Sequence, residues 1–290
     1  MKKIVLGLPK GSLQESTFSM LKKAGFDIKA GSRSYIPIVD DPEIDARLIR
    51  AQEMSRYVEQ GMLDVGITGY DWIVENNSDV IKVENLVYAK QGLSPVRWVL
   101  AVPNESSIQS VKELEGKRVA TEAVGLTQNY LAKHGVNAHV EFSWGATEVK
   151  TPELVDAIIE ITETGSSLRA NNLRIVETVL ESTTQLIANK TSWKDDWKQK
   201  KIAAFALLLK GALSAETLVL IKMNVKKENI EGITSLLPSM HAPTINHLST
   251  DNWLSIESVV EKSVVREIVP PLKKAGAKDI IEIGLNKVVP

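Results

Sequence analysis

The stretch Ile158-Ile-Glu-Ile-Thr-Glu-Thr-Gly-Ser-Ser-Leu-Arg-Ala-Asn-Asn-Leu173 passes from an apolar run through a short polar loop into a segment that can open a helix. The pattern predicts a strand that ends at Glu160 and a helix over Leu168 to Leu173. Backbone N–H groups and hydroxyls at such a turn can hold a phosphate, helped by the partial positive charge of a helix N-terminus. A carboxylate just before the loop would repel a bare phosphate but can accept hydrogen bonds from the hydroxyls of a sugar. The stretch predicts a sugar-phosphate site, although an ordinary strand-to-helix turn explains the pattern equally well.

Strand and helix signals alternate through the first two thirds of the chain. Lys3 to Leu8 predicts a buried strand, and Leu13 to Ala24 predicts a helix with one apolar face. Such alternation is typical of α/β folds with largely parallel sheets, whose ligands bind at the carboxyl ends of the strands. We expect two α/β lobes, one of residues 1–96 with 181–211 and one of residues 97–180, with a cleft that closes on ligands.

The last part of the chain has a different rhythm. Over residues 212–290 the strand and helix signals follow the order β-α-β-β-α-β, which is that of a ferredoxin-like module. Its acidic residues are scattered, and His241 and His247 lack the spacing of metal ligands. This module is therefore a candidate for regulation or assembly. The segment before it, Thr191 to Lys210, predicts one long helix.

The composition is that of a soluble globular protein, with 43% hydrophobic and 24% charged residues. A net charge of −1 argues against a broad nucleic-acid footprint or a membrane-binding surface. The chain has no cysteine, which excludes disulfides, thiolate catalysis and cysteine-ligated metal. The first apolar run is too short for a signal peptide, and no stretch reaches transmembrane length. We expect a cytoplasmic protein with no nucleic-acid partner and no membrane association.

Several polar residues of the first lobe follow the ends of predicted strands, where α/β folds bind ligands. The loop after the first strand suits an anion or nucleotide contact, but Ser12 could equally be a simple helix cap. Arg50 and Arg97 could be cations of the cleft or ordinary surface charges. The residues expected to bind substrate on this side are Lys10, Gly11, Ser12, Leu13, Gly69 and Asp71.

The second lobe repeats this arrangement. Thr121 stands at a strand exit, and Glu148 follows the turn-rich stretch Gly145-Ala-Thr147. A carboxylate at that place could receive an amino group or a hydroxyl, or it could be a solvated surface acid. The residues expected to bind substrate on this side are Thr121, Thr162, Glu163, Thr164, Gly165, Ser166, Ser167 and Leu168.

With these residues in view, the chain resembles the long form of the ATP phosphoribosyltransferase family, the first enzymes of histidine biosynthesis. The resemblance runs nearly end to end. Its most specific parts are Glu160–Leu173, Gly116-Lys-Arg-Val-Ala-Thr121 and Asp64-Val-Gly-Ile-Thr-Gly69. Shorter matches are Pro9-Lys-Gly-Ser-Leu13, Leu236-Leu-Pro238 and Ala242-Pro-Thr244.

The resemblance implies a fold and an activity. The fold is α/β, with two periplasmic-binding-protein-like lobes of type II and a C-terminal ferredoxin-like domain that binds histidine as a feedback inhibitor. The activity is a Mg²⁺-dependent transfer that joins N1 of ATP to the anomeric carbon of phosphoribosyl pyrophosphate and releases pyrophosphate. The expected assembly is a homo-oligomer, in which dimers combine into hexamers.

The resemblance also implies roles for single residues. Glu160 matches the acid that holds the ribose hydroxyls, and Glu163 to Leu168 matches the loop around the 5-phosphate. Glu160 is also the one candidate ligand of Mg²⁺, which could instead bind through pyrophosphate alone. The catalytic residues expected are Arg50, Arg97, Glu148 and Glu160. Positions in the family that form the nucleotide and pyrophosphate cleft correspond to Arg50, Arg97, Thr121 and Glu148.

The chain departs from the family at a few positions. Ser12 stands where the family often has arginine, so one nucleotide contact is in question and Lys10 is the candidate for its charge. After Arg50 the family often reads Arg-Asp-Ile-Pro, whereas this chain has Gln52-Glu-Met-Ser-Arg56. Glutamate at 160 and serine at 167, where aspartate and threonine are frequent, keep the chemistry.

Two other classes of protein share parts of the pattern. A solute-binding protein would have the two lobes but would normally carry an export signal, which this chain is not expected to have. An amino-acid-sensing interaction protein would explain the C-terminal module but not the loop of acid, hydroxyls and glycine.

Overall fold

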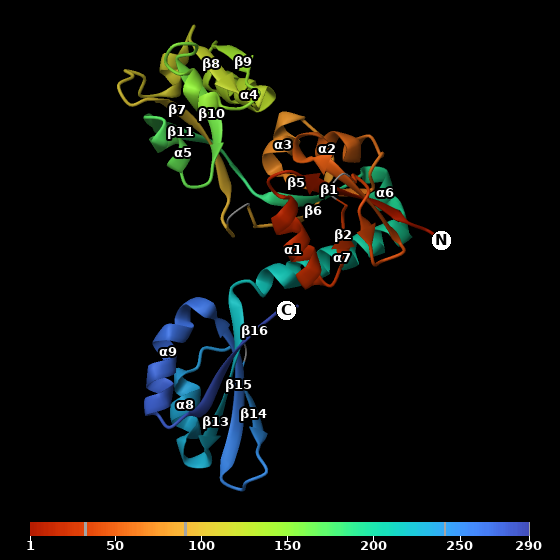
Figure 1. Cartoon of the computed structure of the whole chain (residues 1–290), viewed down its shortest axis with the longest axis vertical. Helices are drawn as coiled ribbons and strands as arrows, with labels where there is room; N and C mark the ends of the chain where they lie inside the picture. Colours follow the sequence, from red (N-terminus) through yellow and green to blue (C-terminus); the bar gives the residue numbers. More distant parts are fainter. Residues whose placement is uncertain (32–33, 90–91, 241, 290) are drawn as a thin grey trace. The chain divides into compact units, whose positions relative to one another are not determined.

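A computed structural model describes residues 1–31, 34–89, 92–240 and 242–289 of the chain (Figure 1). The chain divides into two compact units, one of Met1–Lys22 with Phe26–Ala206 and one of Lys23–Gly25 with Leu207–Pro290. The prediction for His241 lies outside the described residues. Within the described ranges, no helix is both long and apolar enough to cross a membrane.

The first unit contains two lobes, each built on a five-stranded sheet. The first sheet has the strand order β4-β1-β5-β12-β6, with β1 parallel to β4 and β5, and β12 antiparallel to β5 and β6. Its strands are β1 (Ile4–Lys10), β4 (Ile44–Arg50), β5 (Val65–Gly69), β6 (Ile81–Leu86) and β12 (Thr184–Ala188). β5 is buried along its whole length, as expected of a parallel strand covered on both faces. Because β12 comes late in the sequence, the chain returns to this sheet after it has built the second one.

Helices cover the first sheet and bring its polar loops to one edge. They are α1 (Gln14–Ala24), α2 (Ala51–Glu59), α3 (Tyr70–Glu75), α6 (Lys190–Lys194) and α7 (Asp196–Ser214), and a small ribbon of β2 (Ile28–Lys29) and β3 (Ile38–Val39) lies beside them. α2 approaches the sheet closely, since a Cβ at Gly7 or Gly66 would lie 2.3 or 2.9 Å from the Met54 sulfur. Glycines at these two positions therefore let α2 begin directly after β4, with Arg50 at its N-terminus.

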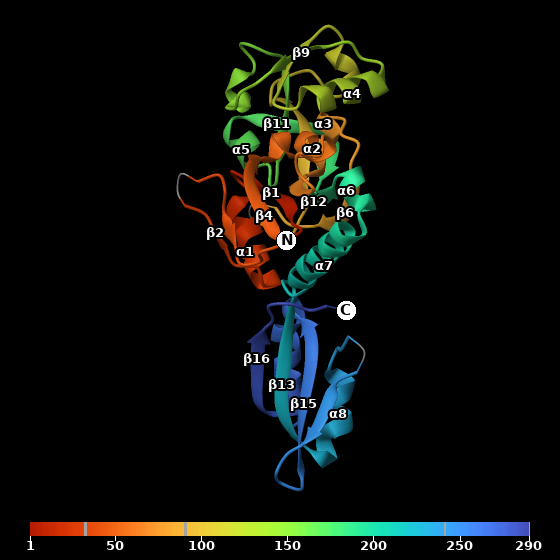
Figure 2. The same ribbon diagram turned by 90° about the vertical axis from the view of Figure 1, so that its right-hand side faces the viewer.

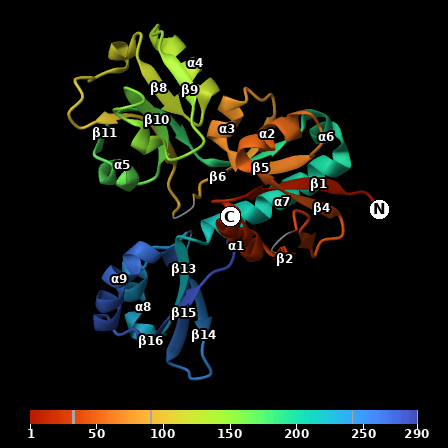
Figure 3. The same ribbon diagram turned by 45° about the horizontal axis from the view of Figure 1, so that its top comes forward.

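The second sheet has the strand order β11-β7-β10-β8-β9. Its strands are β7 (Val96–Pro103), β8 (Arg118–Thr121), β9 (His139–Phe142), β10 (Ala157–Thr162) and β11 (Leu173–Ser182), joined by 3₁₀ turns η1 (Val111–Leu114) and η2 (Thr147–Lys150). α4 (Val124–His134) packs against β9, and α5 (Ser166–Ala170) packs against β11 (Figure 3). β8 runs parallel to both β9 and β10, so the carboxyl ends of these three strands meet at one edge of the sheet.

The second unit carries the ferredoxin-like order predicted from the sequence. Its elements are β13 (Leu218–Lys226), η3 (Lys227–Asn229), α8 (Ile230–Leu236), β14 (Thr244–His247), β15 (Trp253–Glu261), α9 (Lys262–Lys274) and β16 (Lys278–Gly284). The sheet is antiparallel with the order β14-β15-β13-β16, and Figure 2 shows β13 between β15 and β16. Every second residue of β13 is buried, from Val219 to Val225, because one face of the sheet packs on the helices. The predicted fold class is confirmed.

The long helix expected before the second unit differs. The single helix predicted over Thr191 to Lys210 is two helices, α6 and α7, which meet at Asp195. Oδ1 of Asp195 accepts hydrogen bonds from the backbone N–H groups of Trp197 and Lys198, at 3.0 and 2.9 Å. Asp195 therefore caps a new helix, and its carboxylate interrupts a stretch whose helical pattern is otherwise continuous.

Candidate active site

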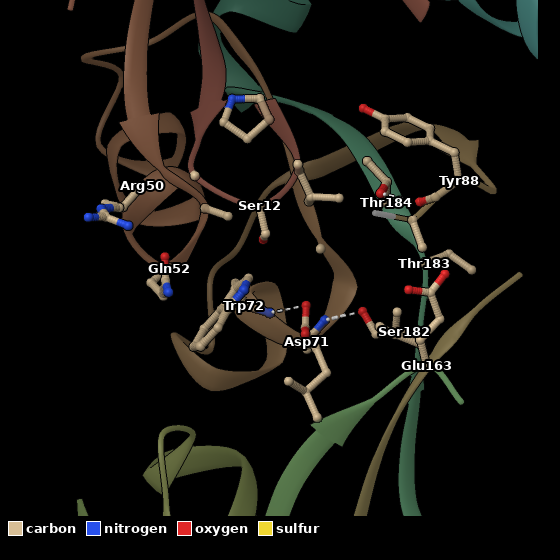
Figure 4. A pocket seen from close by; sticks show the side chains of 18 of the residues that line it. Ser12, Arg50, Gln52, Asp71, Trp72, Tyr88, Glu163, Ser182, Thr183 and Thr184 are labelled. Carbon is tan, nitrogen blue, oxygen red and sulfur yellow. Dashed lines mark hydrogen bonds between the residues drawn. The ribbon is translucent and has the colours of Figure 1, made fainter. Parts of the chain in front are cut away.

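A pocket of about 310 Å³ lies in the first unit (Figure 4). It is lined by the β1–α1 loop, the start of α2, the β5–α3 junction, the end of β10 and the β11–β12 junction. The predicted site residues that line it are Lys10, Gly11, Ser12, Leu13, Arg50, Gly69, Asp71, Thr162 and Glu163. The predicted site residues outside its lining are Arg97, Thr121, Glu148, Glu160, Thr164, Gly165, Ser166, Ser167 and Leu168.

The β1–α1 loop forms one wall of this pocket. Gly11 has a φ of +116°, a conformation that favours glycine, and an added Cβ would lie 3.4 Å from Nη1 of Arg50. Ser12 is exposed, and its hydroxyl forms no hydrogen bond with any described residue, so it does not act as a helix cap. Nζ of Lys10 lies 4.7 Å from the centre of the Tyr35 ring, in a cation–π contact. This wall therefore presents the Ser12 hydroxyl and the Lys10 ammonium group, with the Arg50 guanidinium beside them.

Asp71 joins the two lobes at the floor of the pocket. Its Oδ2 accepts a hydrogen bond from Nε1 of Trp98 on β7 at 2.7 Å, and its Oδ1 accepts one from the backbone N–H of Trp72 at 3.0 Å. The backbone N–H of Asp71 donates to Oγ of Ser182 at 3.0 Å (Figure 4). Burial raises the pKa of Asp71, and the hydrogen bonds from Trp98 and Ser182 oppose that shift. Both carboxylate oxygens already have partners, so the predicted contact of Asp71 with substrate stays a prediction.

Two further contacts join the lobes beside α4. The Glu75 carboxylate accepts hydrogen bonds from the backbone N–H groups of Gly125 and Leu126, at 3.1 and 2.7 Å. These N–H groups belong to the first turn of α4, so Glu75 of the first lobe caps a helix of the second. Nε2 of Gln52 donates to Oε1 of Glu122 at 3.0 Å, and both residues line the pocket.

The second lobe gathers carboxylates near the carboxyl ends of its parallel strands. Burial raises the pKa of Glu160, and the neighbouring charges of Glu148 and Glu122 raise it further, against a hydrogen bond from Thr147. Glu148 in turn accepts a hydrogen bond of 2.5 Å from Oγ of Ser167. Within the described part of the chain, no three histidine, cysteine, aspartate or glutamate side chains are arranged to hold a metal ion. The region suits ligands that donate hydrogen bonds, such as the hydroxyls of a sugar.

The loop after β10 is folded on itself. Its Gly165 has a φ of +73°, and its N–H donates to Oγ1 of Thr162 at 2.7 Å. α5 spans Ser166–Ala170 and not the predicted Leu168 to Leu173, because Gly165 supplies the turn that opens it and Leu173 already begins β11. The first-turn N–H groups of Ser167 and Leu168 have no acceptor among the described residues. They are the unsatisfied donors that a phosphate would need.

About half of the residues that line the pocket were not predicted from the sequence. The missed residues are Pro9, Ala51, Gln52, Trp72, Tyr88, Ala89, Val96, Glu122, Ile161, Ser182, Thr183 and Thr184. One signal could have found the last three, because Ser-Thr-Thr is a run of hydroxyls at the junction of β11 and β12. Thr184 donates from Oγ1 to the backbone oxygen of Tyr88 at 2.7 Å, and the Tyr88 hydroxyl bonds to Thr17 at 2.8 Å. These contacts link distant segments and leave no local sequence signal.

Comparison with known proteins gives the same family over nearly the whole chain. The family model described as ATP phosphoribosyltransferase matches residues 50–211, and the model of the HisG C-terminal domain matches residues 215–287. The ATP phosphoribosyltransferase of Chlorobium luteolum is 57% identical over 99% of this chain and 98% of its own length. That of Solibacter usitatus is 56% identical over 98% of both.

A solved structure agrees with these relatives. The chain is similar to one in the ATP phosphoribosyl transferase (HisG:HisZ) complex from Thermotoga maritima, with a TM-score of 0.61 and 27% identity. The match covers 71% of this chain and 96% of that chain. The resemblance predicted from the sequence is thereby confirmed: the chain belongs to the ATP phosphoribosyltransferase family of transferases.

Proposed function

We propose that this chain transfers the phosphoribosyl group of phosphoribosyl pyrophosphate to N1 of ATP, which is the first step of histidine biosynthesis. Membership of the family supports this activity. The observation that carries the assignment of the site is the juxtaposition in the second lobe. There, partly buried Glu160 lies beside a hydroxyl loop with free first-turn N–H groups.

In the proposed reaction, the lone pair of adenine N1 forms a bond to the anomeric carbon of the pentose. The bond from that carbon to the pyrophosphate oxygen breaks, and its electron pair leaves with pyrophosphate. Because N1 attacks with its own lone pair, no general base is required. The Glu160 carboxylate accepts hydrogen bonds from the ribose hydroxyls, and the segment from Glu163 to Leu168 holds the 5-phosphate. Catalysis then depends on positioning and on stabilisation of the charge that develops in the transition state.

Cationic side chains are proposed to stabilise the leaving pyrophosphate. Arg50 is exposed at the pocket, and its side chain has no hydrogen bond or ion pair with any described residue. Arg97 pairs in register with Thr162 of β10, next to the loop, and its side chain likewise has no ionic partner in the described ranges. Lys10 is the third proposed cation. It would supply the positive charge of the arginine that the family often has at position 12, where this chain has serine. Glu148 and Thr121 are assigned to the nucleotide side of the cleft.

Mg²⁺ is the proposed cofactor, and the donor set fits a metal that arrives with its substrate. Carboxylates such as Glu160 are suitable Mg²⁺ ligands, but no group of three acids or histidines in the described part could form a protein cage. The ion would neutralise pyrophosphate charge when bound, and Glu160 is the one protein ligand we assign to it. Arg50 and Arg97 would share the remaining charge.

We assign regulation to residues 212–290, which would bind histidine and thereby lower turnover. We assign catalysis to two lobes, one of residues 1–96 with 181–211 and the other of residues 97–180. The ferredoxin-like sheet and the match to the family's C-terminal domain support a separate module. A homo-oligomer of dimers that form hexamers and a cytoplasmic location are part of the same proposal. Histidine should inhibit the full chain, and deletion of residues 212–290 should abolish inhibition; inhibition that survives the deletion contradicts this assignment.

The activity is tested by release of pyrophosphate from purified protein with ATP, phosphoribosyl pyrophosphate and Mg²⁺. We expect release that requires both substrates and gives a product with the pentose on adenine N1. Reactions that lack one substrate are the controls. Binding of a small molecule with no pyrophosphate release would instead favour a solute-binding protein.

A further inference from the structure

The second lobe displays a pair of aromatic side chains that its core does not use. The Trp144 side chain is 94% exposed, and Phe142 is 45% exposed. Their rings meet edge to face, with centroids 4.7 Å apart and planes at 82°. An indole so exposed leaves a large apolar face in water, which marks it as a candidate contact for a ligand or a partner.

This pair lies at the edge of the sheet where the proposed substrate residues gather. Phe142 ends β9 and pairs in register with Thr121 of β8, and the Ser143 N–H donates to the Thr121 oxygen at 2.8 Å. The strand order places β8 between β9 and β10. With neighbouring strands about 4.8 Å apart, Phe142 lies about 10 Å from Ile159, which pairs with Thr121 on the other side of β8 and directly precedes Glu160. That distance is comparable to the span from a pentose to a purine attached to it.

The loop that carries Trp144 is tied to the proposed sugar-phosphate site. The Ser143 and Thr147 hydroxyls are hydrogen-bonded at 3.0 Å, and the Thr147 side chain lies close enough to Glu160 to lower the pKa of that carboxyl. Ser167 of the phosphate loop donates to Glu148, directly after Thr147. Between these anchors, Gly145 and Ala146 both have positive φ, at +117° and +49°. The anchored loop therefore holds Trp144 outward at the edge of the sheet where β8 and β9 end.

The described residues that line the pocket offer no comparable aromatic face. The aromatic ones among them, Trp72 and Tyr88, are 9% and 4% exposed, and the Tyr88 hydroxyl is bonded to Thr17. A purine that attacks the anomeric carbon must lie next to the pentose and needs a flat apolar surface. Indole rings stack on bases because every base has a π-face.

We propose that Trp144, supported edge-on by Phe142, stacks on the purine ring of ATP and positions it beside the pentose held at Glu160. This inference rests on the proposed function, of which it names a further binding residue. It predicts that Trp144 governs the affinity for the nucleotide and not the affinity for the sugar phosphate.

The test compares Trp144→Ala, Trp144→Phe and Leu154→Ala. Trp144→Ala should raise both the KM and the directly measured Kd for ATP by about 5- to 150-fold, the value of one base–aromatic stack. The KM for phosphoribosyl pyrophosphate should not change, and Trp144→Phe should recover most of the loss. Leu154 is 58% exposed in the same lobe but cannot stack, so Leu154→Ala should match the wild type.

The outcomes separate this inference from the proposed function. If the wild type releases pyrophosphate and Trp144→Ala binds ATP normally, the stacking role is wrong and the activity stands. If Trp144→Ala instead changes the oligomeric state and leaves ATP affinity intact, the pair is a contact between copies of the chain and the inference is overturned. If the wild type has no transferase activity but loses ATP binding on Trp144→Ala, the proposed function fails and the stacking role survives.

Discussion

The cap that Glu75 provides for α4 allows a quantitative test of how the lobes are joined. Glu75→Ala removes the only side-chain acceptor, among the described residues, for the N–H groups of Gly125 and Leu126. Loss of an N-cap acceptor costs about 1 kcal/mol, within about 0.5–2 kcal/mol. Loss of a carboxylate from a helix N-terminus costs about 0.3–1 kcal/mol more. Because both bonds are partly buried, we expect a total loss of about 1–3 kcal/mol of unfolding free energy.

Thermal and denaturant unfolding of the purified variant would measure this loss. For a unit of this size, we expect the Tm to fall by about 2–4 °C for each kcal/mol. Glu75→Gln keeps an acceptor but loses the charge, so it should lie between Glu75→Ala and the wild type. Glu153→Ala is the matched control, since Glu153 is exposed and has no hydrogen bond or ion pair with a described residue. A Glu75→Ala variant as stable as this control would refute the role of Glu75 as a cap between lobes.

The other predictions concern the site. Arg50→Ala should lower kcat/KM about a hundredfold through lost stabilisation of pyrophosphate. Arg56→Ala, in α2 just after Arg50 but outside the pocket lining, should not, and equal effects would contradict the role of Arg50. The pKa of Glu160 is raised above the usual glutamate value of 4.5, so as the pH falls its carboxylate gains a proton at a higher pH than an ordinary glutamate does. A pH profile of kcat/KM should show this acidic limb, and Glu160→Gln should lack it. Burial makes the charged form of Glu160 unfavourable, so Glu160→Gln should unfold at a higher denaturant concentration than the wild type at neutral pH, although it loses activity. A variant less stable than the wild type would contradict this prediction. Burial also raises the pKa of Asp71, so Asp71→Asn should gain stability at neutral pH in the same unfolding assay, and a loss would show that the charged hydrogen bond from Trp98 outweighs the burial cost. An unchanged KM for both substrates would show that Asp71 is structural.

Local patterns predicted most of the architecture because each element carries its own signal. The alternation along β13 and the continuous burial of β5 follow from which faces of their sheets are covered, and both are visible as apolar spacing. The boundary between α6 and α7 was missed because a capping aspartate has the same appearance in sequence as a polar residue on a helix face. The hydrogen bonds of Asp195 that decide between the two exist only in the folded chain.

The site was only partly predictable for a related reason. Lys10 to Leu13 and Thr162 to Leu168 are each one continuous stretch that begins at the end of a strand, so residue type and position after a strand were sufficient to select them. Ser182 reaches the pocket through a return crossing late in the chain, and Trp98 meets Asp71 across the lobes. Such partners are set by the strand order of two sheets, which a single sequence does not reveal.

The most direct measurement is a crystal structure with phosphoribosyl pyrophosphate bound. Our account predicts the ribose hydroxyls at the Glu160 carboxylate and the 5-phosphate on the N–H groups of Ser167 and Leu168. A pentose bound anywhere else, with that loop empty, would contradict the assignment of the site.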